Sequence, residues 1–587
     1  MRFKSILILV LLAALSQDAS AQRRKAAKKP KAKTETKKNT RKSAKEKKAE
    51  QQAQKNKNAE PKAAAKTITP DTVKGATIEV LQSYKPELRK VYKPVISPSM
   101  PPADTSRPEF TYQVPQQTLL YSYNSFPLRP LALGKDSVVL PYSDYLKVGG
   151  GNLSTLLIDA GIGRFRGEDY ETAINLQHNS RRGHIYEQRA SRTGLTANGT
   201  LHRDGMAHSG FVDVSSSRYH YYGYDHGLLH FPSENIRQSF TDINLGVSTK
   251  NEGEGFMGIN YNPSLAFSLY KDRYDATETA IDLKMPVSYD LDTATTLQMS
   301  LNILFAKYAQ PTANISQNNN ILQLTPGVKF RNRGIVGYAG LYPTFGRGMA
   351  YLLPDIWANF NIENTQINFT AGYRSDLRQN TYEQLSTRNP FMRNDYEIRQ
   401  TRTNEMYVSG RTNVGSHIAL DARLAWKQYR NLPLFINDTF GDAKQFVVAY
   451  DPRVNAIVLE GTARYQIANT FSVGLSPAFV NFVGKTYRRV WHEPAIRMTG
   501  DVMVKPLKKL TVTGYLLFMD QLYALKRGDV TEKLNPILDL GGSAEYEITD
   551  RIGAFAQVNN LLNNRYQRWY MYETFGFNIF GGVRVKF

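Results

Sequence analysis

Histidine is the residue type whose placement in this chain suggests chemistry, because seven of its nine histidines fall between His178 and His230. Neutral imidazole is the commonest metal ligand. The crowding therefore suggests a metal site in the segment from Tyr219 to His230, with His220, His226 and His230 as candidate ligands. Residues on alternating strand positions, however, face different sides of a sheet. We therefore expect scattered histidines at an interface or in a lumen rather than a metal ion.

Catalytic motifs are missing from the sequence. It contains no Gly-x-Ser-x-Gly elbow, no phosphate loop and no His-Glu-x-x-His helix. It also contains no cysteine, which excludes disulfides, thiolate metal sites and cysteine nucleophiles. The carboxylates of the polar segments show no pairing beyond what solvated loops require. We expect a protein that is not an enzyme and that has no catalytic residues and no cofactor.

The elements that would position any such residues are strands. From about Asp144 onward apolar residues occupy every second position, as in Ile281, Leu283 and Met285 and again after a short turn in Leu297 and Met299. Successive side chains of a strand point to opposite faces, so one face is apolar and the other polar. Each such segment has roughly ten residues, the length that crosses a membrane at a tilt. The strands of a soluble β-sandwich would also alternate between apolar and polar residues. The lengths of the connections must therefore distinguish a sandwich from a membrane barrel.

Short and long connections alternate along the chain. The long ones include residues 219–235, 310–320, 377–403 and 429–452. Bacterial barrels have short periplasmic turns and long extracellular loops. The ten short turns that we predict lie at residues 167–169, 203–205, 251–255, 290–295, 331–334, 363–364, 413–416, 468–470, 506–509 and 549–551.

Ten short turns flanked by a first and a last strand predict about 22 strands, with the N- and C-termini in the periplasm. We therefore predict an all-β fold, a transmembrane antiparallel outer-membrane β-barrel over residues 141–587, preceded by a disordered N-terminal region. Aromatic residues concentrate where barrels meet the membrane surface. The runs Tyr219 to Tyr224 and Trp569 to Tyr572 are accordingly expected in an aromatic girdle at the extracellular interface.

The N-terminal residues have a different character. Arg2 and Lys4, the apolar run from Ile6 and the small residues before Gln22 predict a cleaved signal peptide over residues 1–21; an uncleaved N-terminal anchor is the alternative. Residues 22–66 form a Lys/Ala-rich tail that carries most of the net charge of +23 and is expected to be disordered in the periplasm. Residues 67–140 are a Pro-rich linker that enters or lies under the barrel.

The last residues of the chain resemble a known family. The segment 556–566, then Gly576 and the closing run from Gly581 to Phe587, is similar to the penultimate and final strands of TonB-dependent receptor barrels. The resemblance implies a barrel of 22 strands and a C-terminal aromatic residue, here Phe587, that the barrel-assembly machinery recognises as an assembly signal. The style of the chain also resembles proteins of the Bacteroidota. No plug domain and no TonB-contact motif are recognisable between the signal and the barrel.

These observations predict a plugless outer-membrane transport or channel component. The lumen would be obstructed by residues 114–140, by inward-folded loops or by a partner protein. The alternative is a binding or assembly scaffold that the barrel anchors and that acts through its basic periplasmic tail. The expected partners are outer-membrane lipid, the barrel-assembly machinery and periplasmic or outer-membrane proteins that bind residues 22–140, but no nucleic acid.

Overall fold

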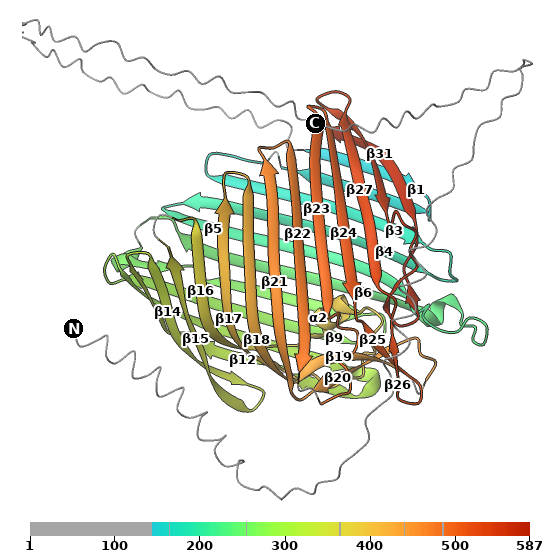
Figure 1. Cartoon of the computed structure of the whole chain (residues 1–587), viewed down its shortest axis with the longest axis horizontal. Coiled ribbons are helices and arrows are strands. Elements are labelled where there is room, and N and C mark those ends of the chain that lie inside the picture. Colours follow the sequence, from blue (N-terminus) through green and yellow to red (C-terminus); the bar gives the residue numbers. More distant parts are fainter. Residues whose placement is uncertain (1–143, 164, 254, 363–364, 439–440, 484–485) are drawn as a thin grey trace, which may run out of the picture. The chain divides into compact units, whose positions relative to one another are not determined.

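The computed structural model describes residues 144–587, apart from residues 164, 254, 363–364, 439–440 and 484–485. The predicted signal peptide, basic tail and Pro-rich linker lie outside the described residues. The described chain is dominated by one large antiparallel sheet (Figure 1). Among the described residues, no helix has the length and apolar character needed to cross a bilayer.

Twenty-five strands form this sheet. They are β1 (Tyr145–Gly151), β2 (Thr155–Ile162), β3 (Tyr170–Arg182), β4 (Arg189–Arg203), β5 (Met206–His220), β6 (Arg237–Asn251), β7 (Ile259–Tyr261), β8 (Ser264–Asp272), β9 (Thr277–Asp290), β10 (Thr295–Gln310), β11 (Ile315–Asn318), β12 (Ile321–Leu324), β13 (Gly327–Asn332), β14 (Ile335–Gly346), β15 (Met349–Asn361), β16 (Ile367–Arg378), β17 (Thr401–Val414), β18 (Ile418–Arg430), β21 (Val454–Ile467), β22 (Phe471–Val483), β23 (Ile496–Leu507), β24 (Leu510–Asp520), β27 (Ile537–Glu547), β28 (Ile552–Asn559) and β31 (Asn578–Lys586).

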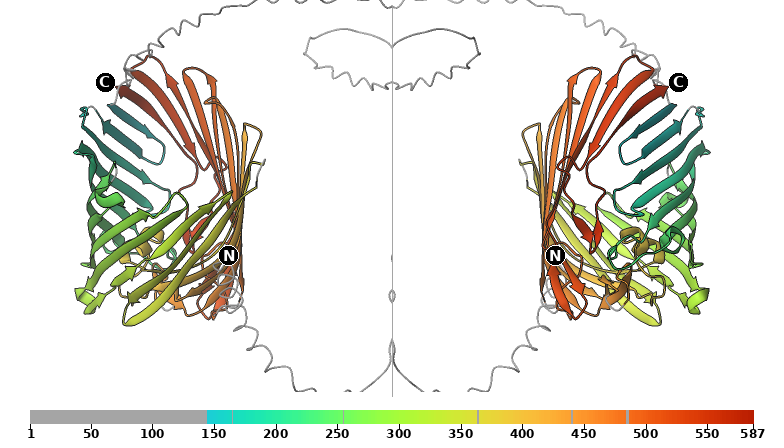
Figure 2. Two further views of the ribbon diagram at one scale, coloured as in Figure 1. Left: turned by 90° about the vertical axis from the view of Figure 1, so that its left-hand side faces the viewer. Right: turned by 90° about the vertical axis from the view of Figure 1, so that its right-hand side faces the viewer.

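The sheet closes on itself. The first strand, β1, pairs with the last strand, β31, in a register that places Tyr145 opposite Lys586 and Gly151 opposite Phe580. Figure 2 shows the last strands of the chain beside the first. Because β7 and β8 follow one another along a single spanning strand, as do β11, β12 and β13, the barrel has 22 strands. The predicted fold class and strand number are confirmed.

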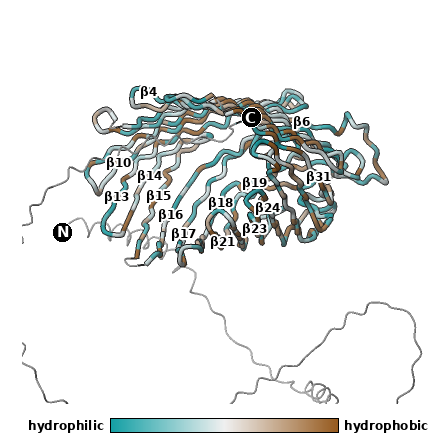
Figure 3. Tube along the Cα trace, turned by 90° about the horizontal axis from the view of Figure 1, so that it is seen from above, coloured by the Kyte–Doolittle hydropathy of each residue, from teal (hydrophilic) through white to brown (hydrophobic). Residues whose placement is uncertain are grey.

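The two faces of the barrel wall follow the sequence alternation, and Figure 3 shows hydrophobic and hydrophilic residues interleaved along the strands. On β18 the side chains of Leu420, Leu424 and Trp426 are exposed on the outer face, whereas Ala425 is buried. Leaving so many large apolar side chains exposed to water would be unfavourable at roughly 25 cal/mol per Å². The outer face is therefore built for contact with acyl chains.

The longest connections all lie at one end of the barrel, although the β1–β2, β8–β9 and β14–β15 connections at that end are short. Within the described residues, the predicted short turns connect strands at one end, which we call the short-turn end and which also holds both described chain ends; residue 254 and residues 363–364 lie outside the described residues. Asp204 and Gly205 have φ values of 52° and 73°, as a two-residue hairpin turn of the type I′ class requires, and glycine adopts the second without strain. The other end, the long-loop end, carries the remaining connections.

The long loops contain secondary structure of their own. Figure 1 shows α2 with the hairpins β19–β20 and β25–β26 at the end of the barrel opposite the C-terminus. The elements outside the main sheet are α2 (Tyr382–Arg388), β19 (Leu432–Asn437), β20 (Phe446–Asp451), β25 (Tyr523–Lys526), β26 (Val530–Lys533), β29 (Gln567–Trp569), β30 (Tyr572–Glu573) and the 3-10 helices η1 (Ser233–Ile236), η2 (Phe256–Gly258) and η3 (Pro311–Ala313).

Candidate functional site

The long loops pack together into a buried apolar cluster, which we call the loop layer. Its members come from the β5–β6, β8–β9, β16–β17, β18–β21 and β28–β31 connections and from the inner face of β6, β8 and β10. The buried residues of the loop layer are Tyr221, Tyr222, Tyr224, Ile236, Phe240, Tyr270, Ala276, Tyr308, Tyr382, Leu385, Phe391, Met392, Tyr396, Ile398, Phe435, Phe446, Val448, Trp569 and Tyr572.

The α2 segment is held against the inner wall by two buried carboxylates. The hydroxyl of Tyr382 donates to Oδ2 of Asp272 at 2.7 Å, and the backbone N–H of Tyr382 donates to Oε2 of Glu278 at 2.7 Å. Asp272 also accepts from the side-chain amides of Gln238 at 3.2 Å and Asn394 at 2.9 Å. Removing a partner from such buried donors leaves them unsatisfied, which costs about 1–3 kcal/mol each. The loop is therefore fixed inside the barrel mouth.

Several other loops meet at β30. The ring of Tyr572 stacks on that of Phe391, with 3.6 Å between centroids, and the ring of Tyr222 lies edge-on at 4.9 Å. The carbonyl of Glu573 accepts from the hydroxyl of Tyr222 and from the side-chain amide of Gln188, both at 2.8 Å. The β28–β31 connection thus contacts the β3–β4, β5–β6 and β16–β17 connections.

These contacts join parts of the barrel that are far apart around its circumference. The β16–β17 connection contacts β8 and β9 in one direction around the barrel and β30, within the β28–β31 connection, in the other. Many strands of the wall lie between the β16–β17 connection and each of these partners. Contact over such separations requires the loops to extend across the barrel mouth. The loop layer therefore spans the long-loop end. Inward-folded loops were one of the three predicted ways to obstruct the lumen.

A lumenal pocket of about 400 Å³ lies below the loop layer. It is bounded by the inner faces of β16, β18 and β21 to β24 and by α2 and β29. Its basic lining residues are Arg378, Arg388, Lys427, Arg497 and Arg568, and its acidic ones are Glu460 and Glu493. Positive charge therefore prevails in this pocket.

Three of these cations lack a counterion within the described residues. The guanidinium of Arg388 pairs with Glu493, and Lys427 lies 3.4 Å from Oε1 of Glu405. Within the described part of the chain, the side chains of Arg378, Arg497 and Arg568 make no ion pair, and the guanidinium of Arg568 donates to the carbonyl of His492. Burial, followed by the nearby charges of Arg568 and Arg378, lowers the pKa of Arg388 to about 10, so it stays protonated at neutral pH. The pocket can thus attract an anion.

The predicted aromatic girdle at Tyr219 to Tyr224 and Trp569 to Tyr572 is wrong. Tyr221 and Tyr222 are 1% and 7% exposed, and Trp569 and Tyr572 are 6% and 3% exposed. These residues belong to the loop layer because they follow the ends of β5 and β28, beyond which strand parity no longer sets the direction of the side chains. Burying their large apolar area within the layer is more favourable than leaving it exposed at the rim.

The three candidate metal ligands do not converge. The Nε2 atom of His220 lies 3.4 Å from Oε2 of Glu187, the Nε2 atom of His226 contacts the carbonyl of Tyr222 at 3.0 Å, and His230 is exposed. No group of three or more His, Asp or Glu side chains among the described residues has the geometry to hold a metal ion. Phe587 lies beside β1, where its backbone N–H donates to the carbonyl of Asp144 at 3.0 Å. Its role as an assembly signal stays a prediction.

The basic pocket residues were not identified from the sequence. The inward parity of Arg378 and Arg497 could have indicated them, since Phe369 and Tyr373 point outward on β16. Arg388 and Arg568 lie in loops, where no period marks a face. Their contribution becomes visible only once the loops are folded.

Comparison with known proteins identifies the fold. No protein-family model matches the chain, and no curated protein matches it. Among solved structures, it is similar to the FrpB iron transporter from Neisseria meningitidis, at 12% identity over 76% of this chain and 81% of that chain with a TM-score of 0.58. The ferric enterobactin receptor from Pseudomonas aeruginosa matches at 10% identity over 76% and 80%, with a TM-score of 0.58. The siderophore receptor PirA from Acinetobacter baumannii matches at 6% identity over 76% and 80%, with a TM-score of 0.59.

The described barrel therefore has the fold of TonB-dependent outer-membrane receptors, as the final strands predicted. The similar structures are named as transporters and receptors. Identities this low establish the fold, whereas function depends on the chemistry of the individual site.

Proposed function

We propose that the protein is an outer-membrane transport or channel component for anionic solutes, with both chain ends in the periplasm and the loop layer on the extracellular side. The observation that carries this proposal is the set of three cations without counterions in the lumenal pocket, namely Arg378 and Arg497 on the barrel wall and Arg568 on β29. Fixed cations in a restricted pore attract anions and repel cations.

The pocket residues have distinct roles in this proposal. Arg378 and Arg497 bind the anion directly, because neither makes an ion pair within the described residues, although Glu460 and Glu493 line the same pocket. Arg388 and Glu493 link α2 to the β22–β23 connection, so their ion pair couples the pocket to the layer above it. Displacement of the layer would open the pocket toward the long-loop side.

The scaffold alternative depends on residues 22–140, which lie outside the described residues, and it stays a prediction. The absence of a plug likewise stays a prediction. The transport proposal is supported by the barrel fold that the protein shares with transporters and receptors and by the polar inner wall.

The test uses the full-length protein in planar bilayers under a salt gradient. Replacing residues 381–398 with a short Gly-Ser linker removes α2 and its contacts with Asp272 and Glu278. We expect this loop-excised variant to conduct far more than the unaltered protein and to prefer anions. Adding Arg378→Ala and Arg497→Ala should shift the reversal potential toward the value of a cation-selective pore, because two fixed positive charges leave the pore lining.

The matched control shortens another long loop, the tip of the β25–β26 hairpin at residues 527–529, which contributes no residue to the loop layer. Conductance of this control should equal that of the unaltered protein. A loop-excised variant that stays closed, or that prefers cations while both arginines are present, would contradict the proposal.

A further inference from the structure

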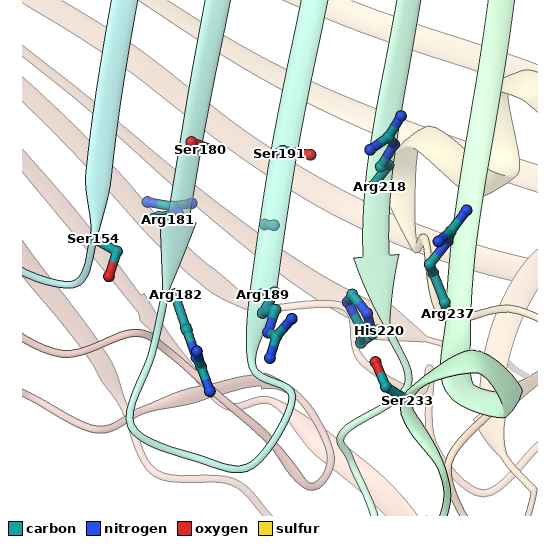
Figure 4. Close-up of a pocket in the computed structure, with 11 residues that line it drawn as sticks. Ser154, Ser180, Arg181, Arg182, Arg189, Ser191, Arg218, His220, Ser233 and Arg237 are labelled. Atoms are coloured by element: carbon teal, nitrogen blue, oxygen red, sulfur yellow. The ribbon is translucent and has the colours of Figure 1, made fainter.

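A second basic cleft lies at the long-loop end of strands β3 to β6, with a volume of about 350 Å³. Figure 4 shows its side chains along the ends of these neighbouring strands. The lining residues are Ser154, Ser180, Arg181, Arg182, Arg189, Ala190, Ser191, Arg218, His220, Ser233 and Arg237. We call this site the arginine cleft.

Strand register places most of the arginine cleft on the outer face of the barrel, whereas Arg181, which pairs with Ala190, has inward parity. Arg182 pairs with Arg189, Ser191 pairs with Arg218, and His220 pairs with Arg237. Residues that are paired across two strands lie on the same face of the sheet. Every second residue along each strand, toward the middle of the wall, also lies on that face. Leu176 opposite Leu195, both 42% exposed, belongs to this face. The cleft therefore points away from the lumen.

Polarity changes stepwise along this outer face. On β4 the apolar Leu195 is followed on the same face by Thr193, Ser191 and then Arg189. On β3 the order is Leu176, His178, Ser180 and Arg182. A transmembrane barrel has an outward apolar band bordered by interfacial residues. The arginine cleft thus lies just beyond the apolar band, at the depth where lipid headgroups begin.

The cations of the arginine cleft are incompletely neutralised. Glu187 pairs with Arg189 at 3.0 Å and with His220 at 3.4 Å. Within the described residues, the side chains of Arg182, Arg218 and Arg237 make no ion pair. Nε of Arg189, Nε of Arg237 and Nδ1 of His220 are buried without a hydrogen-bond partner among the described residues.

Buried polar atoms are normally satisfied by a partner, so an unpartnered set that faces one cleft calls for an explanation. His220 is itself only 8% exposed. Arginine binds phosphate through two parallel N–H···O bonds, and the hydroxyls of Ser180 and Ser191 are additional donors, whereas that of Ser233 donates to Oε2 of Glu187 at 2.9 Å. The cleft therefore has the composition of a phosphate site.

We propose that the arginine cleft binds the phosphorylated headgroup of a glycolipid in the outer leaflet of the membrane. Its position favours a lipid over a soluble anion, because the acyl chains of such a lipid would lie along the apolar face that begins at Leu176 and Leu195. Binding there is separate from the lumenal pocket. The lipid would tie the ends of β3 to β6 to the membrane surface.

The experiment titrates full-length protein in detergent micelles with diphosphorylated lipid A, with dephosphorylated lipid A and with inorganic phosphate, and follows bound species by native mass spectrometry. The unaltered protein should retain diphosphorylated lipid A and should bind the other two probes weakly. The double variant Arg218→Ala/Arg237→Ala should bind diphosphorylated lipid A about tenfold or more weakly, since each arginine supplies charge-assisted hydrogen bonds. The pair Arg218→Lys/Arg237→Lys should recover part of the affinity.

The matched control is Arg203→Ala, which removes an outward arginine from the opposite end of β4. Its affinity should equal that of the unaltered protein. Heat-modifiable migration in gels reports whether each variant keeps its folded barrel. Equal affinity of the double variant and the unaltered protein would overturn the proposal, as would equal binding of dephosphorylated lipid A. Tight binding of inorganic phosphate alone would reassign the cleft to a soluble anion and also overturn it.

Discussion

Asp272 is the residue on which the attachment of the α2 segment most depends. Its Oδ1 accepts from the backbone N–H of Tyr274 at 2.9 Å and of Ala276 at 2.8 Å. Its Oδ2 accepts from three side chains of the layer and the wall, including Tyr382. One carboxylate therefore fixes both its own turn and the α2 segment across the barrel mouth.

Replacing this carboxylate should release the α2 segment. In Asp272→Asn, an amide group takes the place of one carboxylate oxygen, so either the turn or the α2 contacts lose their acceptor. The expected cost is about 3 kcal/mol, enough to speed opening of the segment on the order of 100-fold. The measurement is the rate at which trypsin cleaves after Arg388 and Arg393 in detergent micelles.

The control for this variant is Asp275→Asn in the same turn, where the carboxylate is exposed and pairs with Lys271 at 3.5 Å. A surface pair of this kind contributes little. Similar cleavage rates for the two variants would show that Asp272 does not hold the segment.

At the scale of elements, the β19–β20 hairpin depends on a buried histidine in the β22–β23 connection. The Nδ1 atom of His492 lies 2.9 Å from the carbonyl of Phe435, and its ring contacts that of Trp569 at 5.3 Å. Burial lowers the pKa of His492 to about 3, an effect that the charges of Arg568 and Arg388 reinforce. The side chain is therefore neutral in the docked hairpin.

This histidine makes hairpin docking sensitive to acid. A released His492 would titrate near pH 6.5, whereas the docked one titrates near 3, so the released state binds more protons between these values. Docking should be strongest above about pH 6.5 and weaken as the pH falls toward 3. Hydrogen exchange of residues 432–451 at pH 7.5 and pH 5, corrected for intrinsic rates, checks this.

The variant His492→Phe removes the titrating group while keeping a ring in the cluster. Its exchange in residues 432–451 should change little between the two pH values. If the variant and the unaltered protein respond equally to acid, another group controls the hairpin.

The elements themselves differ in how far the sequence predicts them. The barrel strands and the ten short turns were predictable because the period of two and the turn residues are local properties of the chain. The loop layer was not, because Tyr221, Phe391 and Tyr572 are brought together from distant segments that have no period. Aromatic residues next to a strand end fit a membrane girdle and a buried cluster equally well, and only the folded loops distinguish them.

For the candidate site the same limit applies. Inward parity could be assigned to Arg378, Lys427 and Arg497 from their strands, and outward parity to Arg182 and Arg189. Convergence of Arg388 and Arg568 with the wall depends on loop packing. Strand alternation therefore specifies the wall residues of the pocket, and contacts across the barrel mouth specify its loop residues.

At the scale of the whole molecule, closure of the sheet determines what each face of the alternating strands contacts. Pairing of β1 with β31 removes the open edges that lipid could not satisfy. One face of every spanning strand is then available to acyl chains and the other to the lumen. The transport proposal and the arginine cleft both depend on this assignment of faces.

The most direct measurement of that assignment uses single spin labels in the reconstituted protein. The chain has no cysteine, so one cysteine can be introduced at a time. Labels at Val408, Leu424 and Leu459 should collide with oxygen dissolved in the lipid. Labels at Ser409 and Thr462, which lie on the inner face, should collide with a water-soluble nickel complex. Equal accessibility of the two sets to the nickel complex would contradict a closed barrel whose outer face lies in lipid.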